Sequence, residues 1–289
     1  MTNTLGVDVG GSFIKALRLE ADGAIDKTLS IPLPVTTEEM MEAVVAAAAT
    51  LRTAGTAGVG VGMAGLVRWQ EGVFAWGPHL PGEEIPVLDR LQEALGLAVT
   101  VDNDVNCAVL AELHRGAAAG FRHVVMVTIG TGIGGGIIFD SAIYRGSSFA
   151  GELGHMTMVP NGELCACGHR GCWETLVADA TVQPWLADAR AGGLTAGRKI
   201  AETGRWLGRG LVNLVAVLDP EVIVVGGGVM VAAGDLLLPV ARAEVETHLP
   251  GGSVRGPVEI RTAAAGPWAG ALGAALLAEE VLSQSTSGA

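Results

Sequence analysis

The chain has 289 residues, of which 49% are apolar and 17% are charged, a composition that excludes intrinsic disorder because burial can offset the folding entropy. Its 18 basic and 30 acidic residues give a net charge of −12, which disfavours nucleic acid and anionic membranes as partners. No signal peptide and no unbroken apolar span are recognisable, so we expect a cytoplasmic protein.

Apolar runs separated by glycine predict alternating strands and helices. We expect strands at Leu5–Val9, Phe13–Leu19, Val59–Met63, Val99–Val101, Val124–Thr128 and Val222–Val225. We expect helices at Glu38–Arg52, Val87–Leu95, Asp104–Arg115, Arg198–Leu218, Asp235–His248 and Trp268–Leu282, followed by a frayed tail over Ser283–Ala289.

Two stretches share one layout, which we interpret as an internal repeat. LGVDVGGSFIKALRL and VVMVTIGTGIGGGII each read as an apolar strand, a glycine-rich turn and a second strand. The repeat predicts an α/β protein with two similar lobes. We expect an N-terminal lobe over residues 1–103, completed by the helix 268–289, and a C-terminal lobe over residues 104–267 with a loop at 150–175.

Three glycine clusters end predicted strands and together indicate a nucleotide site. Only glycine lets backbone N–H groups approach a polyphosphate without a Cβ clash. One such turn alone could equally be a plain hairpin, but three on one chain favour a nucleotide. The residues are Asp8, Gly10, Gly11, Ser12 and Lys15 at the first turn, Thr131 and Gly132 at the second, and Gly226, Gly227 and Gly228 at the third.

Asp104 follows Asn103 at the start of a predicted helix. Phosphoryl transfer to an alcohol needs a carboxylate that accepts the hydroxyl proton. The positive end of a helix would hold such a carboxylate in place and keep it ionised. A simple helix N-cap is the alternative interpretation of this motif.

Cys165, Cys167 and Cys172 form a C-x-C-x4-C pattern, which in a cytosolic protein indicates a metal more than disulfides. Tetrahedral zinc needs a fourth ligand, for which His155 and His169 are the candidates. His155 can close the tetrahedron from across the loop. The zinc would then be structural, and the alternative is three buried reduced thiols.

A zinc-pinned loop would also carry Glu152 and Glu174. Carboxylates on a fixed loop suit the hydroxyls of a sugar, because each can accept a pair of hydrogen bonds. The sequence therefore predicts a sugar site next to the metal loop.

These motifs occur in an order that resembles the ROK family of bacterial sugar kinases. The segments that carry the resemblance are DVGGSFIK, VDNDVNCAVLAE, TIGTGIGGGII, GELGH, CACGHRGCWE, DPEVIVVGGGV and AGPWAGALGAALLA. The resemblance covers nearly the whole chain. It implies the actin-like (ribonuclease H-like) ATPase fold, with two lobes around a central cleft, and ATP-dependent phosphorylation of a hexose, glucose first, at its 6-hydroxyl. ATP, Mg²⁺ and a structural Zn²⁺ are the implied cofactors.

The resemblance also implies residue roles. Asp104 corresponds to the general base, and Asp8 would help to hold the magnesium. The other matches are Gly65, Asn103, Glu152, His155 and Glu174 as sugar ligands together with Asp104; Gly10, Gly11, Ser12, Lys15, Thr131 and Gly132 in the phosphate loops; Gly227 and Gly228 beside adenosine; and His155, Cys165, Cys167 and Cys172 on zinc.

Departures from the family pattern lie on the acceptor side, apart from a mild change at Ser12, which replaces the usual threonine. His79 stands where many members have asparagine, and Arg68 where a small polar residue or aspartate is common. N-acetylmannosamine, N-acetylglucosamine, fructose and mannose are therefore alternative acceptors, and polyphosphate is an alternative donor. A non-enzymatic sugar sensor and a zinc redox module are the other functional alternatives. The family's habit suggests a homodimer.

Overall fold

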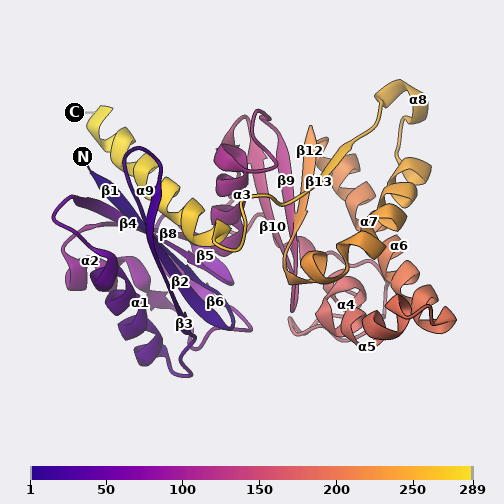
Figure 1. Cartoon of the computed structure of the whole chain (residues 1–289), viewed down its shortest axis with the longest axis horizontal. Coiled ribbons are helices and arrows are strands. Elements are labelled where there is room, and N and C mark those ends of the chain that lie inside the picture. Colours follow the sequence, from indigo (N-terminus) through magenta and orange to yellow (C-terminus); the bar gives the residue numbers. More distant parts are fainter. Residues whose placement is uncertain (1, 288–289) are drawn as a thin grey trace. The chain divides into compact units, whose positions relative to one another are not determined.

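The computed structural model describes residues 2–287 and divides into two compact units (Figure 1). The first unit comprises Met1–Ala119, Ile143–Ala150 and Ala265–Ala289, and the second comprises Gly120–Ala142 and Gly151–Ala264. This division differs from the expected boundary after residue 103. Helix α3 (Asp104–Arg115) belongs to the first unit because it packs against α9 (Ala269–Ser287).

The first unit is built on a five-stranded sheet in the order β3-β2-β1-β4-β8. The first three strands form an antiparallel meander, and β4 and β8 continue the sheet parallel to β1. A second, three-stranded sheet has the order β5-β6-β7. The strands are β1 (Asn3–Val9), β2 (Phe13–Leu19), β3 (Ile25–Pro32), β4 (Thr56–Met63), β5 (Leu66–Arg68), β6 (Val73–Trp76), β7 (Ile85–Pro86) and β8 (Ala98–Asn103).

Helices cover both faces of the five-stranded sheet (Figure 1). Helices α1 (Thr37–Leu51) and α2 (Val87–Leu95) bury their apolar sides on one face, and α3 and α9 pack on the other. Glycines let α9 come close: a Cβ on Gly6 or Gly60 would lie 1.8 Å from a carbonyl oxygen of α9. The alanine-rich helix therefore lies directly on bare backbone.

The second unit repeats the arrangement with the order β11-β10-β9-β12-β13, which confirms the predicted internal repeat. An antiparallel hairpin is again followed by two strands parallel to the first, and helices α6 and α7 supply much of the core. The elements are β9 (Val124–Ile129), β10 (Ile133–Phe139), β11 (Ala142–Ile143), η1 (Leu153–His155), α4 (Glu174–Val177), α5 (Asp179–Arg190), α6 (Leu194–Leu218), β12 (Val222–Gly226), α7 (Gly228–His248), α8 (Gly252–Arg255) and β13 (Glu259–Thr262).

Three predicted helix limits were wrong. Helix α6 begins at Leu194 rather than Arg198. Helix α7 begins at Gly228 rather than Asp235, since its N-cap, Gly227, offers no side-chain signal. Helix α9 continues to Ser287, so the tail expected from Ser283 is helical there, and positions 288–289 lie outside the described residues. Within residues 2–287, no helix is long and apolar enough to cross a membrane.

Candidate functional site

Asp104 lies at the β8–α3 corner (residues 102–106), where the chain turns from strand to helix. Asn103 is the N-cap of α3: its Oδ1 accepts the N–H groups of Val105 (2.8 Å) and Asn106 (3.1 Å). Its Nδ2 donates to the carbonyl oxygen of Gly65 at 3.0 Å. The corner thus brings together Gly65, Asn103 and Asp104. Because Asn103 is the residue that caps α3, the simple N-cap interpretation does not account for Asp104.

Asp8, at the end of β1, is electrostatically coupled to Asp104. Burial raises the pKa of Asp8 to about 7, the charge of Asp104 adds to the rise, and Lys15 opposes it. Gly270 also borders this carboxylate, because a Cβ there would lie 2.6 Å from it. Asp8 and Asp104 are both partly buried, and two carboxylates that interact in this way favour a bound cation.

In the first glycine turn, Gly10 and Lys15 donate hydrogen bonds to backbone carbonyl oxygens of the first unit. The N–H of Gly10 donates to the carbonyl oxygen of Phe13 at 3.0 Å, which closes the hairpin. Lys15 Nζ donates to the carbonyl oxygen of Pro267 at 2.8 Å. The structure therefore places the Lys15 ammonium on the segment before α9.

The two unusual acceptor-side residues have different surroundings. The Arg68 guanidinium is bound by Glu84 (3.0 and 2.6 Å) and Glu71 (2.8 Å) on the surface. His79 lies against the first glycine turn, because a Cβ on Gly11 would come within 2.9 Å of the His79 Cβ. Of the two, His79 is therefore next to the predicted phosphate loop.

The second glycine turn, between β9 and β10, is held from both sides. The Gly130 N–H donates to the Gly132 carbonyl (2.9 Å), and the Asp179 N–H donates to the Gly130 carbonyl (2.8 Å). A Cβ on Gly132 would lie 2.6 Å from Glu174 Oε2. The predicted phosphate turn and the predicted sugar ligand Glu174 are therefore neighbours, whereas the Thr131 side chain is exposed.

Two glycines that lie in the predicted nucleotide turns, Gly130 and Gly228, have no packing reason to be glycine among the described residues. A Cβ on Gly130 or Gly228 would meet no atom of the described residues within 4 Å, and neither glycine has a left-handed backbone. Gly227 differs: its φ is 92°, and a Cβ would lie 2.4 Å from the Ile129 carbonyl oxygen. Gly130 and Gly228 leave bare backbone facing open space, which suits the approach of a phosphate or a nucleoside.

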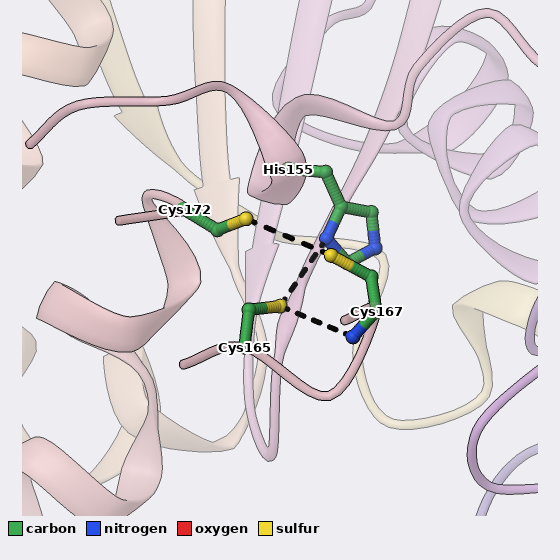
Figure 2. A group of neighbouring side chains, drawn as sticks. All are labelled: His155, Cys165, Cys167 and Cys172. Atoms are coloured by element: carbon green, nitrogen blue, oxygen red, sulfur yellow. Dashed lines mark hydrogen bonds between the residues drawn. The ribbon is translucent and has the colours of Figure 1, made fainter. Parts of the chain in front are cut away.

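His155, Cys165, Cys167 and Cys172 form a compact group of potential metal ligands (Figure 2). Their ligand atoms all lie within 4.8 Å of one another. Cys165 Sγ is 3.6 Å from His155 Nδ1, and Cys167 Sγ is 3.7 Å from Cys172 Sγ. Tetrahedral zinc with thiolate ligands places sulfur atoms roughly 3.8 Å apart, so the donor set and its spacing fit zinc. His169 contacts Cys167 but is not a member of this group.

Electrostatics within the group favour one thiolate. Burial raises the pKa of Cys167, but hydrogen bonds from the backbone of His169 and from the other thiols lower it to about 6 overall. Burial, and then a hydrogen bond to Glu174 at 2.8 Å, raise the pKa of Cys165.

Glu152 and Glu174 lie on either side of His155. The Glu152 carboxylate is 3.7 Å from His155 Nε2, and the Glu174 carboxylate is 3.8 Å from His155 Nδ1. Burial raises the pKa of Glu152, His155 opposes the rise, and Glu174 adds to it. The second unit therefore gathers all three of its predicted sugar ligands beside the cysteine group.

Comparison with known proteins identifies the family. The family model described as "ROK family" matches residues 4–281. The chain belongs to the ROK family. The resemblance seen in the sequence is therefore confirmed.

ROK relatives match this chain over nearly its whole length. A glucokinase of Streptomyces coelicolor is 34% identical over 310 residues, covering 96% of this chain and 98% of that protein. An N-acetylmannosamine kinase of Citrobacter koseri is 30% identical over 295 residues, covering 96% and 99%. The ROK glucokinase of Streptomyces griseus, solved with glucose and AMPPNP, has a TM-score of 0.84 at 33% identity, covering 96% and 99%. The expected two-lobed, actin-like ATPase fold is confirmed.

Sequence reasoning gave no role to Asp102 in this ROK chain. Its side chain is only 3% exposed and accepts a hydrogen bond from Arg145 Nε at 2.6 Å, and Arg145 stacks on Trp69. No local pattern could have indicated this pair, because 43 positions separate the two residues.

Proposed function

We propose that this chain transfers the γ-phosphoryl group of ATP to the 6-hydroxyl of a hexose, glucose before others. The observation that carries the proposal is the similarity, along 96% of the chain, to a ROK glucokinase solved with glucose and an ATP analogue. The chain is a sugar kinase of this family, and its own features agree with the chemistry: a carboxylate at a helix start and glycine turns open to a ligand.

On the acceptor side, Asp104 is the general base. Its carboxylate accepts the proton of the 6-hydroxyl while the oxygen attacks the γ-phosphorus. Asn103 and Gly65 keep the corner in place and contribute hydrogen bonds to the sugar. Glu152, His155 and Glu174 bind the remaining hydroxyls.

On the donor side, backbone N–H groups of the glycine turns bind the phosphates, and the bare backbone at Gly228 accommodates the nucleoside. Bound Mg²⁺ would offset the charge of the phosphates, and Asp8, whose pKa is about 7 without a cation, would help to hold it. Besides the bare backbone at Gly130, the donor-side residues are Asp8, Gly10, Gly11, Ser12, Lys15, Thr131, Gly132, Gly227 and Gly228.

His155, Cys165, Cys167 and Cys172 would hold a structural zinc. Four protein ligands leave no open position, so the metal would supply no nucleophile and would instead fix the loop. This fixes Glu152 and Glu174, the two carboxylates beside His155, before the sugar arrives.

The Asp104→Asn variant tests the mechanism. We expect kcat for glucose to fall by about 10³-fold, because the variant cannot accept the proton, while the dissociation constant of glucose stays within about threefold. Asp89→Asn is the matched control, since Asp89 also lies in the first helical turn of an element of the first unit. Turnover of Asp104→Asn within tenfold of wild type would remove Asp104 from this role.

N-acetylmannosamine is the second candidate acceptor, favoured by the 30% identity to an N-acetylmannosamine kinase. Comparing kcat/KM for glucose, mannose, fructose, N-acetylglucosamine and N-acetylmannosamine, with ATP and with polyphosphate, ranks acceptors and donors together. A sugar sensor would bind a hexose but release no ADP. The homodimer stays a prediction, which sedimentation would test.

A further inference from the structure

Arg145 lies in the segment Ile143–Ala150, which packs with the first unit although the chain on both sides belongs to the second. Its Nε donates to Asp102 Oδ2 at 2.6 Å, and its guanidinium carbon lies 4.5 Å from the centre of the Trp69 ring. Only 16% of the side chain is exposed. Arg145 therefore connects three separate stretches of the first unit.

The Asp102 carboxylate links Arg145 to the β8–α3 corner by hydrogen bonds. Its other oxygen, Oδ1, accepts the N–H of Asn103 (2.7 Å) and Nδ2 of Asn106 (2.8 Å). A carboxylate buried to this extent is costly unless a cation and hydrogen bonds compensate it. Removing Arg145 would leave that charge unpaired two positions before Asp104.

Arg145 also shapes the chain that leads to Glu152. Its carbonyl oxygen accepts the N–H groups of Ser148 (2.9 Å) and Ala150 (3.1 Å), which closes a turn. The turn ends directly before Gly151 and Glu152. The same residue thus anchors the corner with Asp104 and the start of the segment that supplies a sugar ligand.

We propose that Arg145 is a positioning residue for the acceptor: through Asp102 it holds the β8–α3 corner in the arrangement that Asp104 needs, and it anchors the segment before Glu152. The proposal rests on the proposed kinase function. Rates of phosphoryl transfer depend on the placement of the base to within an ångström, so loosening this anchor should lower kcat.

The central experiment compares Arg145→Gln with Arg18→Gln in steady-state kinetics and thermal unfolding. Arg18 is a matched control: its side chain is also 16% exposed, it is ion-paired with Glu20 at 2.9 Å, and it lies in the same unit. We expect Arg145→Gln to lower kcat by about tenfold or more, with the KM for ATP within about twofold. Arg18→Gln should lower stability but leave kcat within about twofold.

Two further variants separate positioning from stability. Arg145→Lys keeps a cation but loses the planar group that stacks on Trp69. The double variant Asp102→Asn/Arg145→Gln removes both charges. We expect both to regain thermal stability relative to Arg145→Gln while kcat stays low.

The kinetic and stability measurements can contradict the positioning role of Arg145 or the kinase function. Recovery of kcat together with stability in either further variant would reduce Arg145 to a structural role and overturn the proposal. If Arg145→Gln does not fold, a folded Arg145→Lys with kcat within threefold of wild type overturns it as well. A wild-type protein inactive on every hexose would instead refute the kinase function, and the positioning role with it.

Discussion

At the scale of single residues, Gly130 and Gly227 look alike in sequence but have different reasons to be glycine. Gly227 needs its freedom for the fold, since its φ is 92° and a side chain would collide with β9. Among the residues that the structure describes, nothing places either constraint on Gly130. A glycine that the fold does not require is best explained by a ligand that must come close.

Gly130→Ala therefore separates binding from folding. We expect the KM for ATP to rise by about tenfold, since the methyl group would occupy space for a phosphate, while the melting temperature changes little. Gly227→Ala should instead destabilise the protein, because alanine disfavours that backbone and would clash. Equal effects of the two variants on stability would contradict this distinction.

Asp8 gives a pH-dependent prediction. Its folded pKa of about 7 exceeds the unfolded value of 3.8, so folding favours the protonated carboxyl. The stability contributed by Asp8 is therefore lost as pH rises from about 4 to about 7. Without added Mg²⁺, the melting temperature of Asp8→Asn minus that of wild type should increase over this range and level off above it.

Measuring both proteins in buffers of equal ionic strength isolates the contribution of Asp8, because all other titrating groups are shared. Added Mg²⁺ should stabilise the wild type more at pH 8 than at pH 5, where the carboxyl is protonated. A melting-temperature difference that stays flat with pH would show that Asp8 titrates normally.

At the scale of elements, local signals decided what the sequence could predict. Helices α2 and α3 begin and end as expected, since Gly96 ends α2 in a left-handed conformation and Asn103 caps α3. The strands β5, β6 and β7 have two to four residues each, too few for a recognisable alternation, and they were missed. Helix α5 was missed as well, within a stretch that carries Pro184.

Residues of the candidate site could likewise be predicted only where they belong to a local sequence motif. The cysteine group and the glycine turns are short motifs, so their residues could be named in advance. His155 rather than His169 was already predicted as the fourth ligand, and it is His155 that lies in the cysteine group. The Arg145–Asp102 pair could not be predicted at all, because it depends on where a distant segment packs.

At the scale of the whole molecule, one sheet order occurs twice and each copy has a separate core. The cysteine group belongs entirely to the second unit. There it is followed by Trp173, which is fully buried and donates from its indole to the Trp206 carbonyl of α6 at 2.9 Å. Metal bound to this group should therefore stabilise one unit and not the other.

We expect about one zinc per chain by elemental analysis, and Cys167→Ser, which loses a ligand, should retain much less. In that variant, hydrogen exchange should accelerate in β9, β10 and α6 but stay at the wild-type rate in β1 and β4, because the first unit has its own core. Cys107→Ser is the matched control, since Cys107 is buried in the first unit and lies outside the metal group. It should keep the zinc and disturb only the first unit. Purified protein without zinc, or exchange that accelerates equally in both units of Cys167→Ser, would show that no metal holds the second unit together.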